Sequence, residues 1–574
     1  MDKMIVRRQI PDGSHELPSH IAPVLRRIYA ARQIQSTNEL SRDLKSLNAY
    51  HALFNIDKAA ILLADAIMAK QKIIVVGDYD ADGATSSALS ILALKAMGAI
   101  NADFLVPNRF TYGYGLTPPI VDMAAKLKPD LLMTVDNGIA SHAGIERAND
   151  LNIKVLVTDH HLAPEILPKA DVIVNPNQPS DLFPSKHLAG VGVVFYVLCA
   201  LRAELIKRDW FYQQSLTVPN MANYLDIVAL GTVADVVPLD RNNRILVHQG
   251  LIRIRAGQCR PGITALLKVA GRHASRLVAA DLGFVVGPRL NAAGRLDDMS
   301  VGIRCLLADN EGEAVRLAAL LNQLNLERRE IESDMQFDAM RTVQNWLGRG
   351  QELPLGVCLY EPDWHQGVIG LVASRIKEKI HRPVIAFANG DEATLKGSAR
   401  SIKGLHIRDV LDGIATKYPD LIDKFGGHAM AAGLSLAKNK LNQFREAFNQ
   451  AVKAKVDEKI LQGCIESDGE LDEVFFTLET AHLLRDAGPW GQGFPEPIFD
   501  GVFDLLDQRL VGEKHLKLTL RQLGGERVLD AIAFQIDLQK WPNYRQAQVR
   551  IAYRLDVNEF RGVERLQLLV EHIE

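Results

Sequence analysis

Short segments of almost entirely apolar residues recur between residues 72 and 175, and stretches long enough for helices separate most of them. These segments are KIIVV (72–76), DLLMTV (130–135), IKVLVT (153–158) and ADVIVN (170–175). Strands that are apolar on both faces are typical of a parallel sheet covered by helices on both sides. The alternation therefore predicts an α/β domain, in which binding sites lie beyond the carboxyl ends of the strands.

Acidic residues and histidines follow the predicted ends of three of these strands and of one later apolar helix (YLDIVALGTVADVVPL). In chain order they are Asp78, Asp80 and Asp82, then Asp136, then Asp159, His160 and His161, and finally Asp235. Crowded carboxylates repel one another and are usually tolerated only when a cation lies between them. Oxygen and imidazole ligands suit Mn²⁺ or Mg²⁺, and a pair of such ions can promote attack of water on a phosphoryl group.

Each of these residues has a simpler role when it is considered alone. Asp80 or Asp82 could equally be the N-cap of a helix that follows the first strand. A single histidine such as His160 is more often a surface loop residue than a ligand. The metal interpretation is favoured because four separate strand or helix ends supply the same kind of side chain.

The rest of the chain divides by its hydrophobic pattern. We expect a helical segment over residues 1–70, the first α/β domain over 71–310 and a second, smaller α/β domain over 351–460. Leucines with three-four spacing predict a connecting helix over 311–350, about 55 Å long at roughly 1.5 Å per residue. Several short strands in 461–574 predict a small closed β-barrel.

Composition limits the classes of protein that fit. The net charge of −3 argues against a protein that is basic throughout, although residues 371–409 hold eight Lys and Arg against four Asp and Glu. Five cysteines without a CxxC pair argue against a disulfide framework and indicate a reducing cytoplasm. The longest apolar run, residues 191–200, is half of the roughly 20 residues that a membrane-spanning helix needs, so we expect a buried helix and no membrane.

The motifs DYDADG, VDNG, TDHH and GTVADVVPL, in this order, resemble the four motifs of the DHH phosphoesterase superfamily. PRLNAAGRL (288–296), WHQGVIGLVASR (364–375), KGSARS (396–401) and GGHAMAAG (426–433) resemble further signatures of its bacterial single-strand-specific exonucleases. The resemblance covers nearly the whole chain. It implies an α/β fold in which a DHH parallel-sheet domain is joined by a long helix to a DHH-associated domain, followed by an OB-like barrel that binds nucleic acid.

The resemblance also assigns roles to the acidic cluster. Asp136 matches the carboxylate that bridges two metal ions, and Asp80 matches a ligand of the second ion. The other ligands of the first ion are matched by Asp82, His160 and Asp235. Many members have a histidine where this chain has Val76, so we expect either that the second ion is held more weakly or that Asp78 compensates as its ligand. His161 matches a residue that faces the phosphate, and we assign it to catalysis together with Asp136 and Asp159.

We expect the remaining motifs to contact the substrate. By resemblance to the family, a cluster of such residues binds a 5′ phosphate. The candidates are Arg109, Tyr114, Arg289, Asn291, Arg295, Ser398, Arg400, Gly427 and His428. GGHAMAAG could alternatively be a tight turn before a helix, and KGSARS could be a solvated loop. Trp490 and Phe494 could stack on bases, but we favour packing in a linker for both.

The function that these features favour is hydrolysis of single-stranded DNA from its 5′ end to mononucleotides, in DNA repair and recombination, with Mn²⁺ or Mg²⁺. By resemblance, the expected partners are single-strand-binding protein and a RecQ-type helicase, and the chain is expected to be monomeric. One alternative is a phosphodiesterase for short oligonucleotides or cyclic dinucleotides, against which the terminal barrel argues. Another is a replication scaffold with a degraded metal site, against which the complete acidic set argues.

Overall fold

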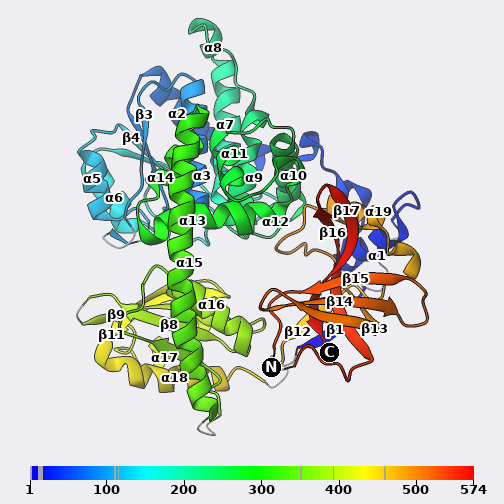
Figure 1. Ribbon diagram of the computed structural model, residues 1–574. Helices are drawn as coiled ribbons and strands as arrows, with labels where there is room; N and C mark the ends of the chain where they lie inside the picture. The colour runs from blue at the N-terminus through cyan, green and yellow to red at the C-terminus, as the bar shows by residue number, and fades with distance from the viewer. Residues whose placement is uncertain are drawn as a thin grey trace. The chain divides into compact units, whose positions relative to one another are not determined.

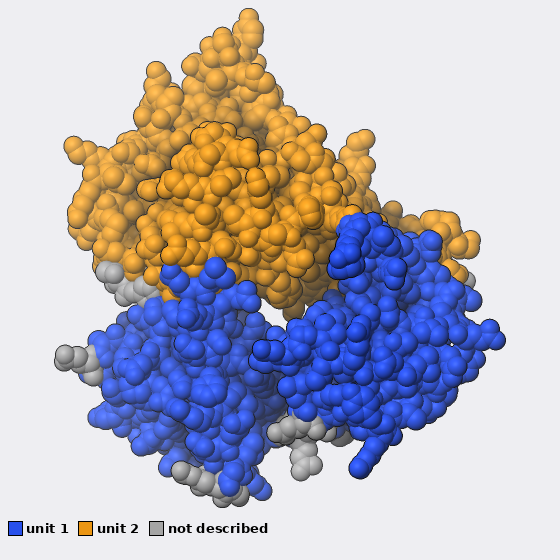
Figure 2. All heavy atoms as spheres, viewed as in Figure 1, with its two compact units in different colours: residues 1–9, 326–484, 497–574 blue, residues 10–325, 485–496 orange. Residues whose placement is uncertain are grey.

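The structure is a computed structural model that describes residues 3–10, 17–108, 112–113, 115–348, 352–391, 393–457, 460–538 and 540–574. The chain forms two compact units (Figure 2). Unit 1 consists of Met1–Gln9, Leu326–Leu484 and Pro497–Glu574, and unit 2 consists of Ile10–Asn325 and Arg485–Glu496. Each unit is therefore assembled from segments that are distant in the sequence.

Unit 2 contains a five-stranded sheet in the order β3-β2-β4-β5-β6, and all of its strand pairs are parallel. The strands are β2 (Ile73–Gly77), β3 (Ala102–Leu105), β4 (Leu131–Val135), β5 (Lys154–Thr158) and β6 (Val172–Val174). The four strands expected from the apolar segments are confirmed. The sequence did not predict β3, because this edge strand is only partly buried and its residues, ADFL, lack a continuous apolar run.

The order of the strands brings the ends of β2, β4 and β5 side by side. The chain passes from β2 to β3 on one side and then returns to β4 on the other, which makes a switch point between β2 and β4. In open α/β sheets, ligands bind in the crevice at such a point. Apolar residues of α5 (Pro118–Ala125) and α6 (His142–Asp150) cover one face, while α3 (Ala81–Ala96) and α7 (Gly190–Lys207) pack against the same strands.

The other described helices of unit 2 are α1 (Pro23–Ala31), α2 (Ile56–Met68), α8 (Trp210–Gln213), α9 (Leu225–Ala234), α10 (Arg241–Arg255), α11 (Pro261–Val269), α12 (Ala279–Asp281), α13 (Gly287–Leu296) and α14 (Ser300–Leu307). Several of them, among them α9, α10 and α11, are grouped on one side of this sheet (Figure 1). The apolar run at 191–200 lies inside α7, as predicted, and most of its residues are buried. Within the described ranges, no helix has both the length and the apolar character needed to cross a membrane.

The long connecting helix is confirmed as α15 (Glu311–Gly348), which Figure 1 shows as one continuous helix. Unit 1 then forms a second five-stranded sheet in the order β10-β11-β9-β8-β7. Its strands are β7 (Val357–Tyr360), β8 (Val384–Asn389), β9 (Thr394–Arg400), β10 (Lys424–Gly427) and β11 (Ala431–Ala437), and its helices are α16 (Ile369–Ile380), α17 (Ile407–Lys417) and α18 (Leu441–Lys453).

Two alternatives for this second sheet are wrong. KGSARS is not a solvated loop, because residues 396–400 belong to β9, which pairs with β8 and β11. GGHAMAAG is not a turn before a helix, because it forms the hairpin between β10 and β11. Gly427 permits the tight turn of this hairpin, because its φ is 140° and a Cβ there would clash with the carbonyl oxygen of Ala431.

The predicted C-terminal barrel is confirmed, with five strands closed in the order β13-β14-β15-β17-β16. The strands are β13 (Phe499–Val511), β14 (His515–Gln522), β15 (Val528–Ala533), β16 (Gln548–Phe560) and β17 (Val563–Ile573), preceded by β12 (Cys464–Ser467) and α19 (Leu478–Asp486). Closure pairs every strand on both sides, which removes exposed sheet edges.

The expectation of a helical segment over residues 1–70 is wrong at its start. Met4–Arg7 form β1, which pairs in parallel with Cys464–Ser467 of β12. The Arg7 side chain also reaches Asp500, with 3.0 Å between Nη2 and Oδ2. Such a strand exists only because a partner about 460 residues away supplies its hydrogen bonds, so no local pattern in the sequence could indicate it.

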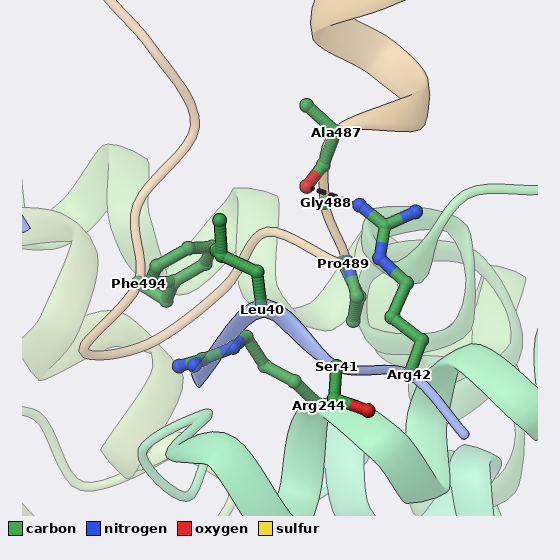
Figure 3. Close-up of a pocket in the computed structure, with 8 residues that line it drawn as sticks. All are labelled: Leu40, Ser41, Arg42, Arg244, Ala487, Gly488, Pro489 and Phe494. Carbon is green, nitrogen blue, oxygen red and sulfur yellow. Dashed lines mark hydrogen bonds between the residues drawn. The ribbon is translucent and has the colours of Figure 1, made fainter. Parts of the chain in front are cut away.

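The segment Arg485–Glu496 belongs to unit 2, and the favoured packing role for Trp490 and Phe494 fits what it shows there. Their rings stack with centroids 4.9 Å apart, and Phe494 is only 2% exposed. The Arg244 guanidinium lies 4.3 Å from the centroid of the Phe494 ring. Figure 3 shows Phe494 and Arg244 lining a small pocket, where Arg42 donates a hydrogen bond of 2.6 Å to the carbonyl oxygen of Ala487.

We therefore expect Phe494→Ala to destabilise the protein and to leave DNA binding unchanged. Removing a buried aromatic ring costs about 3–5 kcal/mol of unfolding free energy. Chemical denaturation would measure this loss, and fluorescence anisotropy with a labelled oligonucleotide would measure the affinity. Weaker binding at unchanged stability would instead assign Phe494 to base stacking.

Candidate metal centre

His160 lies at the centre of the acidic cluster in unit 2. Its Nε2 is 3.1 Å from Asp136 Oδ1, 3.4 Å from Asp235 Oδ2 and 3.9 Å from Asp82 Oδ2. His160, Asp136 and Asp235 follow β5, β4 and α9 respectively, and Asp82 lies in the first turn of α3, which follows β2. The predicted convergence of distant strand and helix ends is therefore present in the structure.

Helix α7 holds Asp82 in place through its N-terminus. The backbone amides of Gly190 and Val191 donate hydrogen bonds of 2.6 and 2.9 Å to the two carboxylate oxygens of Asp82. Free amides at a helix N-terminus favour a negative charge there. Each carboxylate oxygen keeps a second lone pair, so Asp82 can be oriented by the helix and still bind a cation.

Gly190 is a residue of the site that the sequence analysis missed. A Cβ atom at this position would lie 2.7 Å from Asp136 Cβ, which is closer than real Cβ atoms approach one another. Only glycine therefore allows α7 to begin this close to the carboxylate of Asp136. The signal in the sequence was AGVG directly before the apolar run, but glycine near the start of a helix is too common to indicate a ligand site.

Asp80 combines the two roles that the sequence left open. Its Oδ1 accepts hydrogen bonds of 2.9 and 3.0 Å from the amides of Asp82 and Gly83, so it is the N-cap of α3. It also belongs, with Asp78 and Asp136, to a group whose ligand atoms lie within 4.8 Å of one another. The cap interaction uses one carboxylate oxygen and leaves the other for a cation.

Val76 is buried in the apolar core on one face of the β2 sheet and supplies no ligand. Asp78, two residues later, is 6% exposed and is part of the group with Asp80 and Asp136. Asp136 itself has the left-handed backbone conformation, with φ of 62°. Aspartate adopts this conformation more readily than most residues, and here it turns the chain sharply after β4.

The raised pKa values of the carboxyl groups indicate that the cluster needs a positive charge to hold them ionised. Burial, followed by repulsion from Asp235, raises the pKa of Asp82 to about 7. Burial and repulsion from Asp80 raise the pKa of Asp235 to about 8, and burial and Asp82 raise the pKa of Asp136 well above its ordinary value. Burial also lowers the pKa of His160, which favours the neutral imidazole that a metal ligand requires.

The arrangement of donor atoms supports the same conclusion. Among the described residues, His160 Nε2 and Asp235 Oδ2 are buried atoms without a hydrogen bond. Such atoms are costly unless another partner satisfies them. Oxygen atoms with one or two imidazoles are a ligand set for divalent ions of the Mg²⁺ and Mn²⁺ kind. The group therefore fits a divalent metal ion.

His161 differs from its neighbour because it is paired with Asp159. His161 Nδ1 lies 2.7 Å from Asp159 Oδ1, while the amide of Ile139 donates to the other carboxylate oxygen at 2.9 Å. Burial opposes charge on both groups, but the hydrogen bond between them raises the pKa of His161 to about 9 and lowers that of Asp159 to about 2. His161 is thus a cation at neutral pH, and Asp159 fixes its ring.

We expect Asp159→Asn to reduce kcat about 10- to 100-fold with metal affinity nearly unchanged, as is typical when a residue that orients an active-site histidine is lost. The substitution keeps the shape of the side chain but removes the charge that holds His161 protonated. The pKa of His161, followed by NMR of labelled histidine, should fall from about 9 towards its ordinary value. A pKa that stays near 9 would contradict this role for Asp159.

The predicted substrate residues of unit 2 lie on α13, with two exceptions. Asn291 Oδ1 accepts a hydrogen bond of 2.8 Å from the amide of Ala81, so Asn291 positions the acidic loop. Arg289 donates to Asn322 and to the carbonyl oxygen of Val285, and Arg295 is partly exposed near the end of α13. Arg109 and Tyr114 lie outside the described residues.

The other predicted substrate residues lie in unit 1. Ser398 and Arg400 belong to β9, and one nitrogen of Arg400 is 3.1 Å from Ser398 Oγ. Gly370, at the start of α16, faces both side chains, because a Cβ there would lie 2.8 Å from each. Gly427 ends β10 with φ of 140°, and His428 follows it in the exposed hairpin. The hydroxyl and guanidinium donors therefore lie on β9, and the imidazole donor lies after β10, which β11 separates from β9 in the sheet.

Comparison with known families divides the chain as follows. The DHH family N-terminal domain matches residues 72–232, the DHHA1 domain matches 354–454, and the RecJ OB domain matches 467–572. A buried cluster of carboxylates and histidine at the switch point of a parallel sheet, joined to these two further domains, defines a metal-binding phosphoesterase of the DHH family.

Comparison with individual proteins is more specific. The chain is 54% identical to the single-stranded-DNA-specific exonuclease RecJ of Escherichia coli strain K12, over 99% of this chain and 98% of that protein. It is 34% identical to the RecJ of Thermus thermophilus, over 85% of this chain and 67% of that protein. The crystal structure of Thermus thermophilus RecJ with Mn²⁺ covers 97% of this chain and 76% of that chain, with a TM-score of 0.79 and 28% identity. The chain belongs to the RecJ family of single-stranded-DNA-specific exonucleases.

Proposed function

We propose that the protein hydrolyses single-stranded DNA from the 5′ end and releases mononucleotides. The main support for the proposal is that three carboxylates, those of Asp82, Asp136 and Asp235, lie within 3.9 Å of the neutral imidazole of His160. Relatives of 54% identity are named for this substrate and for exonuclease activity. The direction of degradation, which their names leave open, is our extension from the sequence resemblance.

We propose that two divalent ions, Mn²⁺ or Mg²⁺, are held by this cluster. Asp82, His160 and Asp235 form one group of three ligands, and Asp78, Asp80 and Asp136 form another. Structures titled as complexes of Thermus thermophilus RecJ with Mn²⁺ and with Mg²⁺ support either metal. When bound, such ions neutralise phosphoryl oxygens and acidify water so that it can attack phosphorus.

The protein's own residues supply the remaining steps. The cationic His161 donates a hydrogen bond to the scissile phosphate and can protonate the 3′ oxygen of the terminal nucleotide as that nucleotide leaves, so that the attacked phosphate stays on the remaining strand as its new 5′ phosphate. Asp159 keeps the His161 ring in one orientation while this happens. The α7 N-terminus and Asn291 hold the loop that carries Asp82 in place. The carboxylates of the cluster therefore stay together when no metal ion is bound and they repel one another.

We propose that Ser398, Arg400, Gly427 and His428 bind the phosphate backbone, and that Arg295, Arg109 and Tyr114 contribute near the 5′ end. Arg400 and Ser398 lie beside Gly370 at the beginning of α16, where free backbone amides also favour an anion. Arg289 is better explained as a structural residue, because its guanidinium contacts Asn322 and Val285. The barrel is proposed to bind the same strand.

If Asp78 replaces the absent histidine, Asp78→Ala should weaken one metal site selectively. We expect the Mn²⁺ affinity of that site to fall about 10- to 100-fold, because one of three charged ligands is lost. His160→Ala should weaken the other site in the same way, since His160 groups with Asp82 and Asp235. Isothermal titration of each variant with Mn²⁺ would measure both sites, and unchanged affinity at both sites in Asp78→Ala would contradict the assignment.

The function is tested with oligonucleotides labelled at either end, a matched duplex and a cyclic dinucleotide, each incubated with protein and Mn²⁺. We expect 5′-labelled single strands to give labelled mononucleotide at once, and 3′-labelled strands to shorten progressively. A strand with a 5′ phosphate should react faster than one with a 5′ hydroxyl. Cleavage of the cyclic dinucleotide alone, or of the 3′ end first, would overturn the proposal.

We further propose that the protein acts as a monomer in the cytoplasm, in DNA repair and recombination, with single-strand-binding protein and a RecQ-type helicase supplying its substrate. All five cysteines are free thiols, which is compatible with a reducing compartment. Light scattering would test the monomer, and degradation of a strand coated with single-strand-binding protein would test that partner. A helicase that unwinds a duplex should make its 5′-ended strand degradable.

A further inference from the structure

A distorted helix lies next to the end of α9 that carries Asp235. Residues Leu282–Val286 form a π-helix between α12 and α13, and Pro288 follows it within the first turn of α13. Proline has no amide hydrogen, and its ring clashes with the carbonyl four residues earlier, which here belongs to Phe284. The sequence therefore explains why the regular α-helical hydrogen bonds are interrupted at this point.

Arg289 stabilises the distorted turn. Its Nη1 donates a hydrogen bond of 2.7 Å to the carbonyl oxygen of Val285, and its Nε donates at 3.0 Å to Asn322 on α15. The π-helix and the first residue of α13 pack directly on α9, since a Cβ at Gly283 would be 3.1 Å from Val233 and one at Gly287 would be 3.1 Å from Ala234. The distorted turn is thus held by Arg289 on one side and by the last residues of α9 on the other. Those residues of α9 directly precede Asp235.

The consequence of this turn is an aromatic side chain in solvent. Phe284 is 84% exposed, although Leu282 and Val286 in the same turn are buried. Val236, which directly follows Asp235, is 63% exposed and has a φ of 62°, a conformation that is strained for a β-branched residue. Distorted turns of this kind are frequent at functional sites.

We propose that Phe284 stacks on a base of the single strand bound at the metal centre. Exposed aromatic rings bind single-stranded nucleic acid by stacking on bases, and they tolerate every sequence because each base has a π face. Only an unpaired base can offer its face in this way, so Phe284 would also favour a single strand over a duplex. The proposal rests on the proposed function, because it places a base of that substrate beside Asp235.

Phe284→Ala should raise KM for single-stranded DNA about 5- to 100-fold and change kcat less than about twofold, as expected for loss of one stacking contact. Phe284→Leu should show the same defect, whereas Phe284→Trp should restore KM. Tyr212→Ala is the matched control, because Tyr212 is a 90% exposed aromatic residue on α8. α8 follows the far end of the 18-residue helix α7, about 27 Å from Gly190 at roughly 1.5 Å per residue.

Substrates with one abasic site at successive positions from the 5′ end provide the decisive comparison. At the position that meets Phe284, the abasic site should raise KM for the wild-type protein and leave KM of Phe284→Ala unchanged. An unchanged KM in Phe284→Ala, a normal KM in Phe284→Leu, or equal abasic penalties in both proteins at every position would overturn the proposal. Failure of the wild-type protein to degrade single strands would instead overturn the proposed function.

Discussion

Asp136→Asn is expected to abolish nuclease activity while the protein stays folded. Asp136 belongs to the second ligand group and also lies 3.1 Å from His160 of the first, so losing its charge disturbs both. We expect activity to fall at least about 1000-fold, which corresponds to about 4 kcal/mol of lost barrier reduction. Release of labelled mononucleotide under single-turnover conditions would measure this loss.

The choice of asparagine follows from the backbone. With φ of 62°, position 136 suits aspartate and asparagine, whereas alanine would add strain to the loss of the ligand. Asp209→Asn is the matched control, because Asp209 is an exposed aspartate with φ of 54° at the start of α8. Full activity in Asp209→Asn with none in Asp136→Asn would identify the ligand role, and activity in Asp136→Asn within about tenfold of the wild type would refute it.

Removal of divalent metal is expected to make the protein less stable, and more so at higher pH. The pKa values of Asp82 and Asp235 are raised in the metal-free fold to about 7 and about 8. A carboxyl whose pKa is raised by folding stabilises the fold most when it is protonated, and this contribution is lost as pH rises from about 4 through 8. Between about pH 5.5 and 8, the Tm of metal-free protein should therefore fall.

Mn²⁺ should reverse this loss because it binds the ionised cluster. At a concentration about 100 times Kd, binding contributes about 2.7 kcal/mol. At about 2.1 cal/mol/K of unfolding entropy per residue, this corresponds to a Tm increase of about 4 °C for a unit of the size of unit 2. Thermal denaturation with EDTA or with Mn²⁺, at about pH 5.5 and at about pH 8, would measure the effect. Asp136→Asn should show a weaker pH dependence without metal, and an equal dependence in both proteins would contradict the repulsion argument.

Much of the site could be read from the sequence because the fold is an α/β sheet. Apolar segments predict buried parallel strands, and the carboxyl ends of neighbouring strands must meet at one edge. The sequence therefore places Asp78, Asp136 and His160 together. The same reasoning identifies α15 and the barrel strands, whose spacing is a local property of the chain.

The sequence could not reveal contacts that depend on approach between distant segments. Gly190 is required only because α7 begins against Asp136, and β1 forms only because β12 lies beside it. Arg289 was expected to bind substrate, yet its guanidinium contacts Val285 and Asn322. Phe284 belongs to no motif, and its exposure follows from a helical distortion that the sequence did not predict.

Residue type, spacing and order along the chain thus determined the fold class, the metal-ligand chemistry and the family of this protein, because these depend on local periodicity and on side chains that few other roles explain. Only the tertiary structure decided which glycine admits a helix, which carboxylate caps or orients a neighbour, and which aromatic ring faces solvent. These features depend on distances of a few ångströms between segments far apart in the chain, and such distances are set by packing rather than by any local pattern.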